Sequence, residues 1–250
     1  MTNLPKTEHQ LNTKQPIDKL PIENSIKLMI SEQKKGISTI TSQIKIIENI
    51  IDLSVKHLKK SKNSRIIYCG AGTSGRIGVQ DGSELYPTFG WPIERVHYII
   101  AGGLDALVKS IEGAEDDIVS AQEKVNNINL NKNDLVFCIT ASGNTPFTCE
   151  VSKLAEIKKA LTISISNNKY GKIKKLSNYS IILDTKAEVI TGSTRLKAGT
   201  SQKVCMNIIS SLIMVKLGFV KNGLMTNLIA SNKKLIDRKS RIEKIINFTN

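Results

Sequence analysis

Five short apolar runs, separated by helix-compatible stretches, constrain the fold of this chain more than any other feature. The runs lie at Arg65–Cys69, Arg95–Ile100, Asp134–Thr140, Leu161–Ile165 and Ser180–Leu183. The stretches between them include Ala106–Asn126, Pro146–Lys159 and Lys172–Leu176. Strands that are apolar along their whole length and alternate with helices are typical of a parallel sheet covered on both faces. The sequence therefore predicts a three-layer α/β fold around a five-stranded parallel sheet.

Apolar periodicity predicts helices on both sides of this region. Between Glu32 and Lys60, spacings of three and four predict one continuous amphipathic helix with a face of Ile37, Ile40, Ile44, Ile47, Ile51, Val55 and Leu58. Ala198–Leu217 is predicted as a mostly apolar helix and Leu224–Asn247 as a more polar one, whereas residues 1–23 form an irregular, proline-containing arm. We divide the chain into an N-terminal arm and helix (1–60), the α/β domain (61–220) and a C-terminal helical extension (221–250).

The chain is strongly basic, with 36 Lys and Arg against 22 Asp and Glu, which gives a net charge of +14. Such a charge can indicate a nucleic-acid partner when the basic residues cluster among aromatic ones. Here aromatic residues make up only 4% and the lysines are scattered along the chain. We therefore expect no nucleic-acid partner, although a positive field also attracts a small anionic substrate.

Membrane, metal and cofactor signals are also missing from the sequence. No apolar run approaches the ~20 residues of a membrane span, and the N-terminal segment lacks the apolar core of a secretory signal. We expect a cytoplasmic protein with no membrane partner. We also expect no metal and no cofactor, because no ligand spacing links the cysteines and histidines: Cys69, Cys138, Cys149, Cys205, His9, His57 and His97.

The first predicted strand runs into the glycine-rich segment Gly70–Arg76, GAGTSGR, which matches G-x-G-x-x-G. A dinucleotide site also needs a carboxylate at the end of the second strand, where this chain has Ala101-Gly102-Gly103 instead. The loop does offer the hydroxyls of Thr73 and Ser74 beside backbone N–H groups at a helix start, which suits one phosphate. A strand-to-helix turn that merely needs glycine would explain this loop equally well if it stood alone.

A second loop of the same kind follows the third predicted strand. Thr140–Pro146 reads TASGNTP, and Ser142, Asn144 and Thr145 are candidate ligand-binding residues. Thr145 is placed to cap the following helix, with Pro146 in its first turn. Ligands of open α/β sheets bind at the carboxyl ends of the strands. Two such loops on one edge favour a phosphorylated sugar over a nucleotide, as in the sugar isomerase (SIS) fold.

The amino-acid sequences of five motifs, and their order along the chain, indicate a family more specifically than the two loops do. Together they closely resemble the N-acetylmuramic acid 6-phosphate etherases, SIS-fold proteins, and the resemblance runs from about Thr7 to the C-terminus. The motifs are GAGTSGRIGVQDGSELYPTFG (Gly70–Gly90), Ala101-Gly102-Gly103, IEGAED (Ile111–Asp116), ASGNTPF (Ala141–Phe147) and VITGSTRLKAGTSQK (Val189–Lys203).

The resemblance implies a lyase that cleaves the D-lactyl ether of N-acetylmuramic acid 6-phosphate in cell-wall amino-sugar recycling. The products are N-acetylglucosamine 6-phosphate and D-lactate, formed by elimination and rehydration. By position, Glu84 of DGSE matches the family's proton donor and Glu115 of EGAED its second catalytic glutamate, the expected C2 base; Glu112 is its nearest competitor. Two carboxyl groups, one of them held protonated, can perform this chemistry without a metal.

Because SIS proteins commonly dimerise, we expect a homodimer with its sites near the interface, and the apolar faces of Ile37–Leu58 and Ala198–Leu217 are candidates for it. The C-terminal extension is expected to be shorter than in the family, and 221–225 departs from the family's pattern. Two alternatives stay open at this point. One is an aldose–ketose phosphosugar isomerase, which also removes a C2 proton, and the other is a non-catalytic sugar-phosphate-binding regulator, which has no need of the two glutamates.

Overall fold

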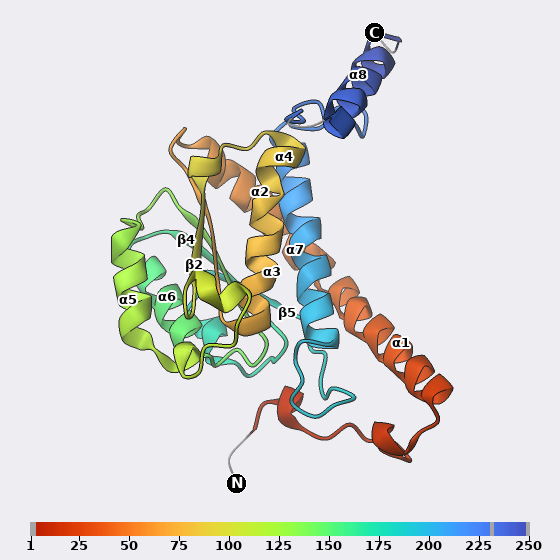
Figure 1. The fold of residues 1–250 in the computed structure, drawn as a ribbon. Helices are drawn as coiled ribbons and strands as arrows, with labels where there is room; N and C mark the ends of the chain where they lie inside the picture. The colour runs from red at the N-terminus through yellow and green to blue at the C-terminus, as the bar shows by residue number, and fades with distance from the viewer. Residues whose placement is uncertain (1–3, 231–232, 249–250) are drawn as a thin grey trace.

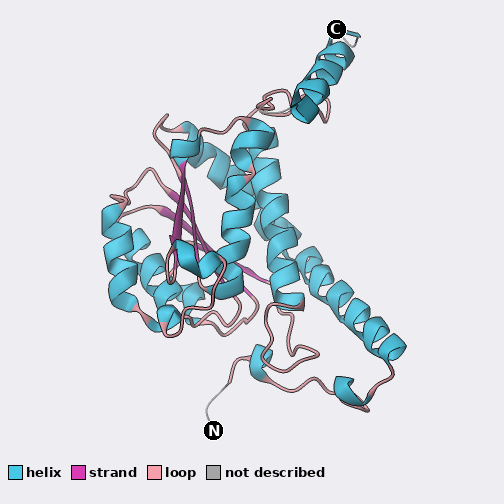
Figure 2. Cartoon of the chain, viewed as in Figure 1, coloured by secondary structure: helices cyan, strands magenta, loops and turns pink. Residues whose placement is uncertain are grey.

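A five-stranded, wholly parallel sheet forms the centre of the protein in a computed structural model that describes residues 4–230 and 233–248 (Figures 1 and 2). Its strand order is β2-β1-β3-β4-β5. The bounds are β1 (Ile66–Gly70), β2 (Val96–Ile100), β3 (Leu135–Thr140), β4 (Leu161–Ser166) and β5 (Tyr179–Ile182). Every pairing is parallel. The predicted fold class is confirmed.

Helices cover both faces of this sheet and extend beyond it (Figure 1). They are α1 (Ile22–Ser38), α2 (Ile44–Lys59), α3 (Gly72–Ser83), α4 (Leu85–Phe89), α5 (Ile118–Asn127), α6 (Pro146–Ile157), α7 (Lys197–Lys216) and α8 (Lys233–Phe248). Short 3-10 helices lie at Lys6–Glu8, Ile17–Lys19, Thr39–Gln43, Ile93–Arg95, Leu104–Leu107, Ala114–Asp116 and Lys172–Lys175. Within the described ranges, no helix has the length and apolarity needed to cross a membrane.

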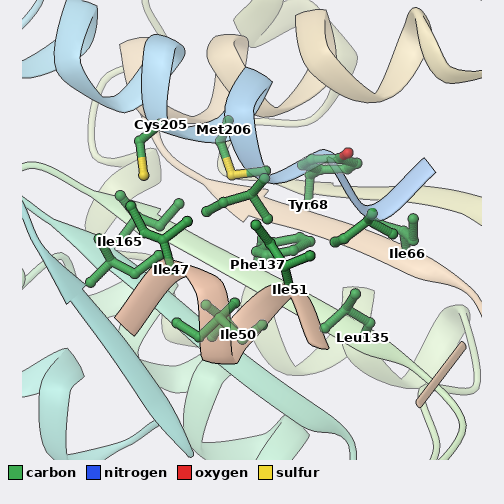
Figure 3. Close-up of a cluster of buried hydrophobic side chains, with 14 of the residues drawn as sticks. Ile47, Ile50, Ile51, Ile66, Tyr68, Leu135, Phe137, Ile165, Cys205 and Met206 are labelled. Carbon is green, nitrogen blue, oxygen red and sulfur yellow. The ribbon is translucent and has the colours of Figure 1, made fainter. Parts of the chain in front are cut away.

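Alternation along the buried strands divides the core into two layers. On β1, Ile66 and Tyr68 face α2, α3 and α7, whereas Ile67 and Cys69 face α5 and α6. Figure 3 shows the first layer, in which three isoleucines of α2 and two side chains of α7 meet the sheet: Ile47, Ile50, Ile51, Cys205 and Met206. Helices bury the side chains on both faces, which explains why the strands are apolar along their whole length.

The prediction of a single continuous helix between Glu32 and Lys60 is wrong. The chain forms α1 and α2 with a 3-10 segment between them at Thr39–Gln43. Hydroxyls at this break donate to backbone carbonyls three residues earlier, Ser38 to Lys35 at 2.8 Å and Thr39 to Gly36 at 2.7 Å. Such bonds compete with the α-helical pattern.

The two predicted dimer faces lie largely inside the chain's own core. Ile47, Ile51, Val55 and Leu58 pack on the sheet, as does most of the apolar face of α7. In the first face only Ile37 and Ile44 are exposed, on either side of the 3-10 break. These buried faces are therefore unavailable to a second copy of the chain.

Two other predicted helices are shorter than expected. Ala106–Asn126 contains helix only from Ile118, where the Asp117 side chain accepts from the backbone N–H of Ser120 at 2.9 Å. The segment before it holds two 3-10 turns, so the IEGAED motif lies in a loop. The first part of Leu224–Asn247 is irregular, and the described helix starts at Lys233.

Helix α3 lies so close to β1 that two glycines are required where they meet. A Cβ on Gly75 would be 2.8 Å from the carbonyl oxygen of Gly70, and a Cβ on Gly70 would be 2.8 Å from the nitrogen of Gly75. Real Cβ atoms do not approach backbone atoms this closely, so any side chain would push the helix away from the sheet.

Gly75→Ala should therefore destabilise the protein by about 1–3 kcal/mol, the usual cost of overpacking a core. Ser83→Ala, at an exposed position of the same helix, is the matched control and should change stability by less than about 0.5 kcal/mol. Urea unfolding measures both variants. Equal stabilities would show that the contact between α3 and β1 relaxes without cost.

Candidate active site

The two hydroxyl-bearing loops lie next to each other at the carboxyl edge of the sheet. Strands β1 and β3 are neighbours, yet the chain visits β2 on the far side of β1 before returning to β3. The loops after β1 and β3 therefore diverge from a topological switch point, where open α/β sheets bind their ligands. This arrangement brings Thr73 and Ser74 to the same edge as Ser142, Asn144 and Thr145.

The hydroxyl of Ser74 is buried and is part of a chain of hydrogen bonds. It donates to Oε1 of Gln202 at 2.9 Å, and Nε2 of Gln202 donates to Oδ1 of Asn167 at 2.8 Å. Nδ2 of Asn167 then donates to the carbonyl of Leu183 at 3.2 Å and to the hydroxyl of Ser201 at 2.9 Å. A backbone carbonyl can only accept, so Leu183 fixes the direction of every bond in the chain. The proton of Ser74 is thereby directed to Gln202, and its backbone N–H stays at the helix start.

In the second loop, Ser142 is better placed to donate to a ligand. Its Oγ accepts from the backbone N–H of Asn144 at 3.1 Å, and its own proton has no acceptor among the described residues. The side chain of Asn144 accepts from the backbone N–H of Lys172 at 3.0 Å, so it holds the loop to the next one. Thr145 occupies the N-cap position of α6, as predicted, but its hydroxyl makes no capping hydrogen bond and pairs with that of Thr140 at 2.9 Å.

A pocket of about 270 Å³ lies beside the loop after β1, on the side of β2. It is formed between the first turn of α3 and the segment from Ala101 to Glu115. Four charged side chains line it: Arg76, Lys109, Glu112 and Glu115. A larger pocket of about 680 Å³ lies at the amino ends of β4 and β5, but no motif residue lines it. The smaller pocket is the candidate active site because the GAGTSGR and IEGAED motifs both line it.

Glu84 lies far from this pocket in the same chain. It follows the last residue of α3, whereas the pocket lies at the start of that helix. At about 1.5 Å per residue, Glu84 lies roughly 12 Å along the helix axis from Arg76 and roughly 18 Å from Gly72, the two α3 residues that line the pocket. One chain therefore brings Glu115 and Glu112 to the pocket but leaves Glu84, which is exposed, at the other end of α3.

A buried carboxylate fixes that far end of α3. Asp81 accepts from the hydroxyl of Tyr68 at 2.8 Å, from Nδ2 of Asn207 at 2.6 Å and from the hydroxyl of Ser210 at 3.0 Å. Burial raises the pKa of Asp81, and the three donors oppose this shift. Burial likewise raises the pKa of neighbouring Tyr98 to about 12, with the charge of Asp81 adding to the effect. Asp81 holds the helix that carries Glu84 against β1 and α7.

The chain of hydrogen bonds around Ser74 was not predicted from the sequence, nor was the place of Arg76 in the pocket. Gln202 and Arg76 both fall inside motifs that were recognised, so the signal was present but gave no role to either residue. Asn167 carried no such signal. No group of three or more His, Cys, Asp or Glu side chains suited to a metal ion occurs in the described part of the chain.

Comparison with known proteins identifies the family. The chain is 41% identical over 237 residues to the N-acetylmuramic acid 6-phosphate etherase of Shouchella clausii, which covers 95% of this chain and 79% of the relative. It is 42% identical to the etherase of Mycoplasma mycoides, over 96% of this chain and 78% of the relative. The chain belongs to the N-acetylmuramic acid 6-phosphate etherase family. A model of the glucokinase regulatory protein N-terminal SIS domain also matches residues 46–155.

Solved structures share the fold of this etherase-family chain at low sequence identity. A protein of E. coli CFT073 in complex with A5P has a TM-score of 0.61 at 15% identity, over 82% of this chain and 97% of that one. A phosphoheptose isomerase from Francisella tularensis has a TM-score of 0.56 at 18% identity, over 78% of this chain and 98% of that one. With the family model, these likenesses confirm the predicted SIS fold.

The two candidate serines should respond differently to loss of the hydroxyl. Ser142→Ala should weaken binding of N-acetylglucosamine 6-phosphate about ten- to a hundredfold, because a hydrogen bond to a charged group contributes roughly 1.5–3 kcal/mol. Ser74→Ala should weaken binding less and stability more, since it leaves Gln202 without a buried donor. Calorimetric titration and urea unfolding of both variants measure the two effects. The opposite ranking would mean that Ser74 donates its proton to the ligand.

Proposed function

We propose that this chain is a lyase that cleaves the D-lactyl ether of N-acetylmuramic acid 6-phosphate. The observation that carries the proposal is a carboxylate-lined pocket beside the hydroxyl-bearing loop after β1, whose neighbour across the switch point of the sheet is the loop after β3. The loops suit a phosphate, and Glu115 suits proton abstraction from the bound sugar. The names of its relatives at about 40% identity support this substrate.

The chemistry follows from the open-chain form of the sugar. Its C1 aldehyde makes the C2 proton acidic, and the carboxylate of Glu115 accepts that proton as general base. The electron pair forms the C2–C3 double bond as the C3–O ether bond breaks, and Glu84 protonates the departing lactate oxygen. Water then adds at C3 and C2 is reprotonated, which gives N-acetylglucosamine 6-phosphate and D-lactate. Thr73, Ser74, Ser142, Asn144 and Thr145 form the loops proposed to hold the phosphate.

The separation of Glu84 from the pocket leads us to propose a homodimer with shared sites. An acid about 12 Å or more along α3 from the pocket cannot protonate a leaving group there. In a two-fold dimer, the partner subunit's Glu84 supplies the missing acid at each site. The exposed isoleucines of α1 offer a surface for this contact, since Ile22, Ile26 and Ile30 recur every fourth residue on one face and are each more than half exposed.

The two alternatives are less well supported. A phosphosugar isomerase also needs a base at C2 but has no use for an acid aimed at a C3 ether. A non-catalytic regulator needs the loops but neither glutamate. We propose that the reaction takes place in the cytoplasm, since a phosphorylated sugar carries charge that membranes exclude.

The two glutamates should separate the steps of the reaction. Glu84→Gln should still exchange the C2 hydrogen with deuterated water but release little lactate, because the base remains and the leaving group is not protonated. Glu115→Gln should lose both exchange and release. Each loss should be on the order of 10²–10⁴-fold. Mass spectrometry of the recovered sugar and a lactate assay measure the two steps.

Exchange that is lost in Glu84→Gln and kept in Glu115→Gln would reverse the two roles. Glu112→Gln is the matched control, because it removes a neighbouring carboxylate of the same pocket. Near-normal lactate release in both Glu84→Gln and Glu115→Gln would contradict the mechanism.

Mixing these two inactive variants tests whether the sites are shared. When equal amounts exchange subunits, about half of the dimers are mixed, and one of the two sites in each has both glutamates. Lactate release should then recover to about a quarter of the wild-type rate. If both glutamates of a site came from one chain, every site in the mixture would carry a defect and no activity would return. Subunits are exchanged by unfolding the mixture and refolding it. Wild-type protein taken through the same procedure provides the reference rate.

A further inference from the structure

Arg76 has a place in the pocket that the proposed catalytic steps do not use. It lies at the first turn of α3 and is half-buried. Its Nε donates to the carbonyl of Leu107 at 3.2 Å and its Nη2 to the carbonyl of Lys109 at 2.9 Å. A guanidinium has five N–H donors. The other three make no hydrogen bond among the described residues, so a donor-rich cation is held rigidly in the pocket wall.

Lys109 adds a second positive charge to the same pocket. Its backbone carbonyl is held by Arg76, and its side chain makes no hydrogen bond or ion pair among the described residues. Glu112 and Glu115 line the pocket too, but no ion pair joins them to Arg76 or Lys109 within the described part of the chain. The two cations therefore stay available to an anionic group on a ligand.

The proposed substrate carries two anions, and the site has two different environments for them. The loops after β1 and β3 present hydroxyls and backbone N–H groups, which suit the phosphate. The pocket on the β2 side of β1 presents a guanidinium and an ammonium group. A guanidinium fork matches the two oxygens of a carboxylate. The second anion of the substrate is the carboxylate of its lactyl group.

We propose that Arg76, assisted by Lys109, binds the lactyl carboxylate and so distinguishes the ether substrate from sugar phosphates that lack it. This inference rests on the proposed function. Arg76 fixes the loop from Leu107 to Lys109 through its Nε and one N–H of its Nη2. It holds the carboxylate with the three N–H donors that remain. The lactyl group is then fixed at two points, by its covalent bond to C3 of the sugar and by its carboxylate at Arg76. The C3–O bond therefore keeps one orientation toward Glu115 and the acid.

The test removes the carboxylate from the ligand and the guanidinium from the protein, separately and together. The ligand pair is N-acetylmuramic acid 6-phosphate and 3-O-isopropyl-N-acetylglucosamine 6-phosphate, in which a methyl group replaces the carboxylate. The protein pair is wild type and Arg76→Gln. Dissociation constants are measured by calorimetry at low temperature in a Glu84→Gln background, and N-acetylglucosamine 6-phosphate is titrated as a third ligand.

Arg76→Gln should weaken binding of the lactyl ether about ten- to a hundredfold, the usual range for a lost hydrogen bond to a charged group. Binding of the isopropyl ether and of N-acetylglucosamine 6-phosphate should change less than about threefold. Lys109→Met should show the same selectivity with a smaller loss. Lys124→Gln is the matched control for net charge, because Lys124 lies close to Gly103 of the same segment but outside the pocket.

An equal loss for all three ligands would overturn the inference and give Arg76 a role in phosphate binding or in holding the loop. An unchanged affinity for the lactyl ether would overturn it as well. If the background still turns over substrate, initial-rate KM values and competitive inhibition constants replace the titrations. Wild-type lactate release is assayed separately, so a failure of the proposed function is distinct from a failure of this ligand selectivity.

Discussion

The close contact between α3 and β1 is the constraint on which the rest of the site depends. With no side chain at Gly70 or Gly75, the helix starts directly above the carboxyl end of its own strand. Its first backbone N–H groups therefore lie at the switch point, level with the loop after β3. The same contact sets the position of Arg76, one residue later, in the wall of the pocket beside β2. The main role of the glycine-rich motif is thus to set the position of the start of α3, and its contribution of ligand-binding side chains is secondary.

Helices α3 and α7 lie side by side (Figure 1), and buried polar contacts join them at each end of α3. Near the start, Ser74 donates to Gln202, and at the far end Asp81 accepts from Asn207 and Ser210. Buried polar groups that are fully satisfied define one arrangement of their elements, because any shift would leave a donor or acceptor unpaired. The two helices therefore behave as a single rigid piece. The family motif at Val189–Lys203 contributes through this contact as well as through any contact with ligand.

The sequence predicts the sheet well because burial on two faces leaves a simple apolar signal in each strand. The carboxyl-edge loops are equally visible, since glycine and hydroxyl residues follow β1 and β3 directly. The break between α1 and α2 was missed because apolar periodicity continues across it, whereas the hydroxyls of Ser38 and Thr39 decide the local conformation. The direction of the Ser74 proton is set by Leu183, more than a hundred residues away. Such a constraint becomes visible only when the fold brings these segments together.

The distance of Glu84 from the pocket follows from the same rigidity. Helix α3 is uninterrupted from Gly72 to Ser83, and hydrogen bonds fix it to α7 at both ends. A hinge that swings Glu84 about 12 Å or more toward its own pocket would have to break the bonds of Asp81, leaving a carboxylate buried without donors. Supplying the acid from a second copy needs no such motion, because a rigid helix carries its glutamate to a fixed position on the surface. The proposed site, shared between two chains, therefore suits a helix that is held at both ends: in that proposal one chain provides the base and the anion-binding groups and the other provides the acid.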